Sequence, residues 1–188
     1  MKSNETKEKI IAQTIDLIRE SNGLTEKITI RKIAEKANVG IGLINHYFGT
    51  KEKLIGECVE RIIGGVIGAF RPALVEGEDS IGTTKRVAKQ VMDFLMENPE
   101  ISKISILGDM TEPQESDNTM GTVRGFGTRL SGGDMQSYHK CNAFMMTAAM
   151  QVAFLRKDVL CRTLGVDFYD KAQRDAFIDD LIERFGVL

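Results

Sequence analysis

Side chains that could catalyse a reaction or bind a metal are few in this chain of 188 residues. The two histidines, His46 and His139, lie far apart in the sequence, and no nucleophile elbow, phosphate-binding loop or HExxH zinc motif is present. His139 and Cys141 are two positions apart, and such positions on a helix point in different directions. We therefore expect no enzymatic activity, no metal site and no cofactor.

The three cysteines, Cys58, Cys141 and Cys161, are odd in number and widely spaced. This pattern favours reduced, buried thiols over a disulfide framework or a zinc site, so we expect all three to act as small core residues. No stretch approaches the ~18 consecutive apolar residues of a membrane span, and the first residues do not open a signal-peptide pattern. The expectation is a soluble, cytoplasmic protein with no membrane association.

The residues best suited to contact a partner lie in the segment from Thr29 to Lys53, whose sequence is TIRKIAEKANVGIGLINHYFGTKEK. Apolar residues recur at helical spacing from Ile30 to Ala37, which predicts a short helix there. Thr29 is a suitable N-cap for this helix. Asn38 follows where a helix commonly ends in a left-handed residue, so the chain is expected to turn at that point.

A second short helix is predicted to start at Gly40. Its inward side carries Ile44 and Phe48. Residues on the opposite side of the helix point outward: Gly42, Asn45 and His46. Gly49 ends this helix, and Thr50 caps the helix that follows. Two short helices joined by a three-residue turn form a helix-turn-helix, whose second helix lies in the DNA major groove.

At this point the sequence resembles the tetracycline-repressor (TetR) family of regulators. The match covers roughly residues 5 to 55, and the helix predicted from Glu5 to Glu20 lies where that family has its first helix. The positions that carry the resemblance are Ala34, the turn at Asn38-Val39, Gly42, His46-Tyr47-Phe48 and Lys51. A helical hairpin with no DNA function would rarely combine this turn with the HYF and TKE strings.

The resemblance implies DNA-contacting residues. Tyr47 and Lys51 would bind backbone phosphates, as their counterparts do in the family, and Thr29 and Arg31 at the start of the preceding helix are similarly placed. Base contacts would come from the first turns of the second helix: Gly40, Ile41, Gly42, Leu43, Asn45 and His46. Asparagine can pair with adenine, and the aliphatic side chains can touch a thymine methyl. Asn45 could instead be merely solvated, and His46 could pack against the first helix.

The segment also departs from the family pattern, because many relatives carry serine-lysine where Gly40-Ile41 stands and glycine at Asn38. Losing that lysine predicts weaker nonspecific binding and a preference for A·T pairs. The formal net charge is -2, but residues 1 to 54 hold ten Lys and Arg against seven Asp and Glu. The basic excess therefore lies at the end that would meet DNA.

The rest of the chain reads as helical, with no alternating strand pattern, so we predict an all-α protein of about nine helices. The expected domains are a helix-turn-helix domain over residues 1–50 and a helical regulatory and dimerisation domain over residues 51–188. One long helix from Thr50 to about Pro72 would join them. The glycine-rich stretch from Met120 to Asp134 predicts only a weak helix, preceded by a mobile loop from Thr111 to Thr119.

The resemblance further implies a homodimer, formed through helices over residues 135–156 and 170–185, that reads a roughly palindromic site. It also implies release from DNA by an unknown small apolar or amphipathic effector. Methionine and phenylalanine side chains of the middle helices are candidates to line its site, although most could simply be core: Met92, Phe94, Met96, Met110, Met120, Phe126, Phe144, Met145 and Met150. The sequence thus favours a repressor, and the alternative is a protein-binding co-regulator that does not bind an operator.

Overall fold

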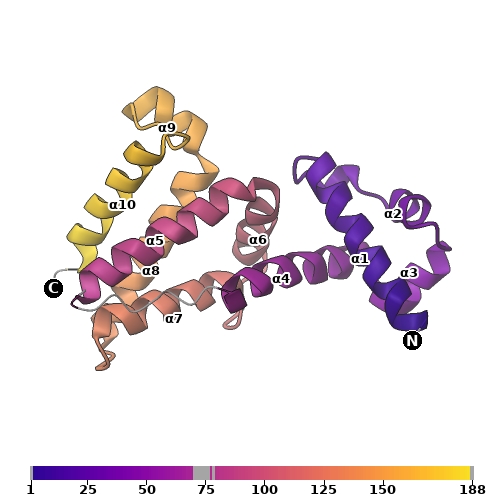
Figure 1. The fold of residues 1–188 in the computed structure, drawn as a ribbon, viewed down its shortest axis with the longest axis horizontal. Helices are drawn as coiled ribbons and strands as arrows, with labels where there is room; N and C mark the ends of the chain where they lie inside the picture. Colours follow the sequence, from indigo (N-terminus) through magenta and orange to yellow (C-terminus); the bar gives the residue numbers. More distant parts are fainter. Residues whose placement is uncertain (1, 70–76, 78, 187–188) are drawn as a thin grey trace. The chain divides into compact units, whose positions relative to one another are not determined.

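Every regular element that the computed structural model describes, over residues 2–69, 77 and 79–186, is helical (Figure 1). These residues form ten α-helices and one 3-10 helix, so the all-α prediction is confirmed and the expected count of about nine was one too low. The elements are α1 (Lys2–Glu20), η1 (Thr25–Lys27), α2 (Ile30–Ala37), α3 (Ile41–Phe48), α4 (Lys51–Ala69), α5 (Ser80–Glu97), α6 (Pro99–Thr111), α7 (Asn118–Ser131), α8 (Ser137–Leu155), α9 (Lys157–Leu164) and α10 (Lys171–Gly186). None of the described helices has both the length and the apolar character needed to cross a membrane.

The chain forms two compact units. Unit 1 contains residues 1–71 and 99–105, and unit 2 contains residues 72–98 and 106–188. Helix α6 therefore contributes its first half to unit 1 and its second half to unit 2. The functional boundary that we placed after residue 50 remains a prediction, because compactness alone does not define where a function resides.

Unit 1 is built around an apolar core. Helix α1 packs against α2 and α4, while α3 packs against α2 and α4. The side chains that fill the centre are almost entirely aliphatic, and they include Ile10, Ile11, Ile18, Ile33, Ile44, Leu54 and Cys58. Burial of this apolar surface, at ~25 cal/mol per Å², holds helices together that are too short to be stable alone.

The turn after α1 makes a close backbone contact within unit 1. Gly23 is buried and has a φ of +70°, a left-handed conformation that glycine adopts without a Cβ penalty. A Cβ at this position would lie 3.0 Å from the carbonyl oxygen of Glu100, in the first turn of α6. Glycine is therefore required both for the turn and for the approach of α6.

In unit 2, α7 and α8 pack along each other, and α5 contacts α7, α8 and α10. The weak helix expected over the glycine-rich stretch is in fact a regular fourteen-residue helix, α7. Asp117 caps it by accepting from the backbone N–H of Met120 at 2.7 Å, and Val123 and Phe126 are buried. The cap and the packing outweigh a glycine cost of about 1 kcal/mol each.

The structure corrects other expectations. Helix α9 was not predicted, and none of its side chains is buried. Asn98 is the N-cap residue of α6, but its side chain donates to the carbonyl of Phe94 and does not cap the helix. Only Cys58 is a core thiol, because Cys141 and Cys161 are exposed. The predicted end of the fourth helix near Pro72 lies outside the described residues.

Candidate DNA-binding interface

Helix α2 begins as the sequence predicts. Thr29 is its N-cap, and the Thr29 hydroxyl accepts from the backbone N–H of Lys32 at 3.2 Å. The Lys32 ammonium in turn donates to the carbonyl of Lys27 at 2.9 Å, which ties the start of α2 to η1. Thr29, Arg31 and Lys32 are all exposed, so this end of α2 presents a hydroxyl and two cations to solvent.

The turn between α2 and α3 has the predicted left-handed residue. Asn38 has a φ of 52° and a ψ of 53°, and its backbone N–H donates to the carbonyls of Ala34 and Glu35. The N–H of Val39 also donates to Ala34, at 3.0 Å. These bonds close α2 and allow the chain to reverse direction before α3 starts.

Helix α3 separates an anchoring side from a free side. Ile44 is fully buried and Phe48 is 6% exposed, so they hold the helix against the core of unit 1. Five positions lie on its exposed side: Gly40, Ile41, Gly42, Asn45 and His46. His46 is therefore exposed, and its contact with DNA stays a prediction. Leu43 and Tyr47 are half-buried between the two sides.

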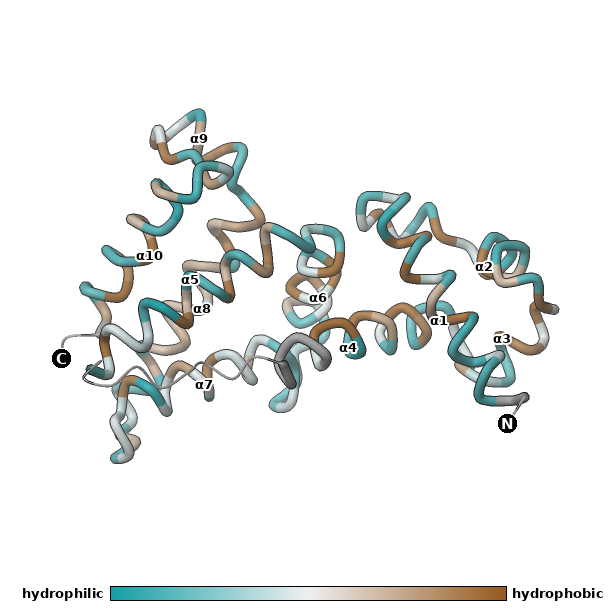
Figure 2. Tube along the Cα trace, viewed as in Figure 1, coloured by the Kyte–Doolittle hydropathy of each residue, from teal (hydrophilic) through white to brown (hydrophobic). Residues whose placement is uncertain are grey.

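Among the described residues, no side chain or backbone packs closely against Gly40, the N-cap of α3, or against Gly42 within the helix. A Cβ built at Gly40 or Gly42 would meet nothing within 4 Å, and both φ values lie outside the left-handed region. Glycine within a helix costs about 1 kcal/mol relative to alanine. Nothing inside the chain accounts for that cost at Gly42. The two helices also differ in hydropathy: Figure 2 shows a mainly hydrophilic α2 beside a more apolar α3.

Lys51 opens α4 next to this surface. Thr50 caps the helix through the N–H of Lys53 at 3.2 Å, as predicted. The Lys51 ammonium donates to the carbonyl of Thr25 at 3.1 Å and lies 3.7 Å from the Glu52 carboxylate. Lys51 thus fixes η1 against α4, a role that the sequence did not reveal because it depends on a contact 26 positions away. An ammonium has three donors, so one can still reach a phosphate.

A thiol buried behind the interface is chemically inert. Cys58 is fully buried, and its Sγ donates weakly to the carbonyl of Ile11 at 3.7 Å. Burial, with a smaller contribution from nearby Glu57, raises the pKa of Cys58 to about 12. The thiolate that would be needed for redox or nucleophilic chemistry is therefore absent at neutral pH. Among the described residues, no three His, Cys, Asp or Glu side chains converge on a possible metal position.

The structure distributes the nine effector candidates over different environments. Met92, Phe126 and Met150 are at most 2% exposed, and Phe94, Met96 and Met120 are half-buried. Met110, Phe144 and Met145 are exposed, so in the single chain they lie on the surface. The role of all nine stays a prediction, but the three exposed ones are better placed to contact another macromolecule than to line an interior site.

Comparison with known proteins places these features in a family context. Residues 25–58 match the family model described as "Bacterial regulatory proteins, tetR family". The nucleoid occlusion factors SlmA of two Actinobacillus pleuropneumoniae strains, serotype 5b (L20) and serotype 3 (JL03), are each 23% identical over 100 residues. That alignment covers 53% of this chain and 49% of each relative, so the chain spans about half the length of the curated relatives that it matches.

Solved structures share the fold. A TetR-like transcriptional regulator from Rhodococcus sp. RHA1 superimposes with a TM-score of 0.63 at 14% identity, covering 95% of this chain and 94% of the other. A TetR-family regulator from Haemophilus influenzae RD gives 0.55 at 17% identity, with 99% and 97% covered. The predicted resemblance is confirmed: residues 25–58 are similar to the model of the tetR family of bacterial regulatory proteins, and the chain shares the fold of solved TetR-like transcriptional regulators.

Proposed function

We propose that this protein is a homodimeric, sequence-specific DNA-binding transcriptional regulator that represses its targets until a small apolar or amphipathic ligand releases it. The observation that carries the proposal is the free side of α3, where Ile41, Asn45 and His46 are exposed while Ile44 holds the helix to the core. A helix held in this way can enter the major groove without disturbing the fold.

Backbone contacts would flank that helix on both sides. Thr29 and Arg31 at the start of α2, with Tyr47 and Lys51 beyond α3, are the proposed phosphate contacts. Exposed Lys32 adds a cation that the sequence-based set did not include. Ile41, Gly42, Leu43 and Asn45 would meet base edges, with Gly40 and His46 beside them, and the near-absence of charge there favours contacts to thymine methyls and adenine.

Dimerisation would use the outward side of α8. Four of its large apolar side chains are exposed by 41–52%, namely Tyr138, Phe144, Met145 and Val152. They recur over much of the helix and leave an apolar strip of the kind that marks a protein interface. Together with α10, the strip gives each copy two helices for a four-helix bundle, which would place two α3 helices about 34 to 36 Å apart.

DNA binding is tested with the purified full chain and duplexes from the region flanking its own gene. We expect a retarded band at low salt. When binding sequences are selected from random duplexes, we expect them to converge on a roughly palindromic site. Gly42→Ala should lose this binding while Gly64→Ala, another helical glycine with open space at its Cβ, should keep it. The absence of any retarded band at low salt would sink the proposal and favour the protein-binding co-regulator.

Dimerisation is tested by sedimentation of Met145→Glu, which puts a charge on the α8 strip. Leu164→Glu is the matched control, because Leu164 is a 69% exposed apolar side chain on α9. The first variant should dissociate and the control should not. A wild-type chain that sediments as a monomer at micromolar concentration would remove dimerisation from the proposal.

A second candidate role comes from the curated relatives, which carry the name nucleoid occlusion factor. A chain with that role would bind DNA through the same α3 surface but would not need to bind at promoters. Mapping the bound sites in cells separates the two roles. Occupancy restricted to a few promoters supports the regulator, whereas dispersed sites away from promoters support the second role.

A further inference from the structure

The short helix η1 holds the ammonium groups of two lysines that come from different helices. Lys32, in the first turn of α2, donates to the carbonyl of Lys27 at 2.9 Å. Lys51, the first residue of α4, donates to the carbonyl of Thr25 at 3.1 Å. A 3-10 helix advances about 2.0 Å per residue, so these two carbonyls, which are two residues apart in the chain, are close neighbours. The two ammonium groups are therefore gathered on one short segment of unit 1.

Both lysines are held by carbonyl oxygens, which carry only a partial negative charge. Among the described residues, no carboxylate lies within ion-pair distance of Lys32. Lys51 lies 3.7 Å from the carboxylate of Glu52, whose side chain is 76% exposed. Lys36, one turn further along α2, is held differently, because it bonds the carboxylate of Glu20. The two positive charges at η1 are thus largely uncompensated, and an anion is the ligand that would compensate them.

The ammonium groups at η1 keep hydrogen-bond donors for such an anion. An ammonium has three donors, and each of these two uses one on a carbonyl of η1. Lys32 is exposed and the side chain of Lys51 is 23% exposed, so both are open to solvent. Helix α3 packs against both α2 and α4, so the two lysines come from the helices that flank the proposed recognition helix. Phosphate contacts on either side of that helix fix its orientation in the groove.

We propose that Lys32 and Lys51 bind a single phosphate of the DNA backbone between them, with η1 as the template that positions their ammonium groups. The inference rests on the proposed DNA binding and goes beyond it by assigning both lysines to the same phosphate. Because the hydrogen bonds to η1 restrain both side chains before DNA arrives, less conformational entropy is lost on binding than with two unrestrained lysines. The resulting hydrogen bonds are charge-assisted, which makes them stronger than neutral ones.

A double-mutant cycle on DNA binding tests whether the two lysines share a phosphate. The full chain is titrated into a fluorescent duplex of arbitrary sequence over a salt series, because a phosphate contact does not depend on base sequence. Lys32→Gln and Lys51→Gln should each weaken binding by roughly tenfold and reduce the slope of log K against log salt by about one. The double variant should weaken binding far less than the roughly hundredfold product, and its slope should still fall by about one.

Lys36→Gln is the matched control for the cycle. It removes an ammonium from the same helix, but from a lysine that is held by a carboxylate, so binding should weaken by no more than about twofold. Lys32→Arg keeps the charge and the donors and should keep the slope of the parent. Circular dichroism verifies that each variant is folded, and Lys32→Met is a second neutral variant that completes the cycle if Lys32→Gln does not fold.

The outcomes of this experiment are distinct from one another. Losses that multiply in the double variant, with a slope reduced by about two, would overturn the shared phosphate and assign a separate one to each lysine. A Lys32→Gln variant that binds as Lys36→Gln does would also overturn it, and would leave Lys32 as a tie between η1 and α2. Both results leave the proposed regulator intact. A parent chain that binds no duplex at low salt would instead remove the DNA-binding function and this phosphate site together.

Discussion

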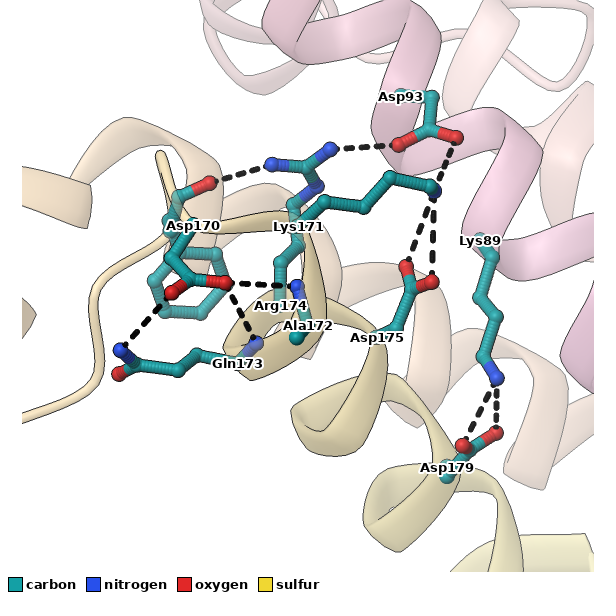
Figure 3. Close-up of polar contacts among 10 residues, drawn as sticks. Lys89, Asp93, Asp170, Lys171, Ala172, Gln173, Arg174, Asp175 and Asp179 are labelled. Atoms are coloured by element: carbon teal, nitrogen blue, oxygen red, sulfur yellow. Dashed lines mark hydrogen bonds and ion pairs between the residues drawn. The ribbon is translucent and has the colours of Figure 1, made fainter.

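Unit 1 and the α5–α10 pair of unit 2 hold their helices by different physical means. In unit 1, the contacts among α1, α2, α3 and α4 are made by aliphatic side chains, and ion pairs such as Lys36 with Glu20 lie on the surface. Between α5 and α10, four ion pairs of the described residues join the helices and one cation, Arg174, is buried (Figure 3 shows the pairs of Lys89 and Asp93). Unit 1 is therefore held mainly by apolar burial, whereas the contact of α10 with α5 adds ion pairs to the buried apolar side chains Ile178 and Ile182.

The largest effect that would test this comparison is the loss of core volume in unit 1. Ile44→Ala should lower the free energy of unfolding by about 2–5 kcal/mol, because Ile44 is fully buried between α3 and the core. Denaturant unfolding of the full chain measures the change. Ile41→Ala, on the same helix but 43% exposed, should change stability by no more than about 0.5 kcal/mol. Equal effects of the two would refute the division of α3 into anchoring and free sides.

The next largest effect tests the close contact between the backbone at Gly23 and that at Glu100 in unit 1. Gly23→Ala should destabilise unit 1 by about 1–3 kcal/mol, since the new Cβ would meet the backbone of Glu100 at 3.0 Å in a left-handed conformation. Gly56→Ala in α4 is the matched change. Its Cβ would meet nothing within 4 Å, so this variant should gain up to about 1 kcal/mol. Thermal unfolding of both variants measures the two changes in stability, which should have opposite signs.

The helix-turn-helix segment is specified by its local sequence. The bounds of α2 and α3, the left-handed Asn38 and the cap at Thr50 were predictable because each depends on residues within four positions. Their apolar spacing also identified Ile44 and Phe48 as inward. Helix-turn-helix geometry is local, which explains why the candidate DNA-binding residues could be named before the fold was known, although their contacts to DNA remain predictions.

The features of unit 2 were less predictable because they depend on tertiary neighbours. The pairing of Asp93 with Arg174 joins positions 81 apart, and no pattern indicated that α5 and α10 would be antiparallel partners. Helix α9 is only eight residues long and none of its side chains is buried, so no core contact marks it. Helix α7 was underestimated because glycine propensity was counted without its cap at Asp117 and its packing on α8.

A smaller effect is expected from the proposed phosphate contact. Lys51→Ala should weaken binding to all DNA sequences alike, by roughly tenfold at low salt, and should reduce the slope of log K against log salt by about one. Asn45→Ala should instead change which base is preferred at one position of each half-site. Anisotropy titrations over a salt series measure both. If Lys51→Ala leaves the slope unchanged, Lys51 does not contact a phosphate and its role is limited to the hydrogen bond with the Thr25 carbonyl.

The smallest effect, a change in acid sensitivity, tests the charged region of the comparison. Burial alone would raise the pKa of Asp93, but the hydrogen bonds from Lys171 and Arg174 outweigh it and hold that pKa below its ordinary value. A carboxyl with a lowered folded pKa contributes stability that is present above its unfolded pKa, near 4, and is lost as pH falls through the folded pKa. The free energy of unfolding should therefore fall as the pH drops below about 4, and Asp93→Asn should make this fall shallower. Ile41→Ala removes no charge, so this control should show the same fall in unfolding free energy as the parent. If the fall is equally steep in Asp93→Asn, the ion pairs of α10 contribute nothing to acid sensitivity.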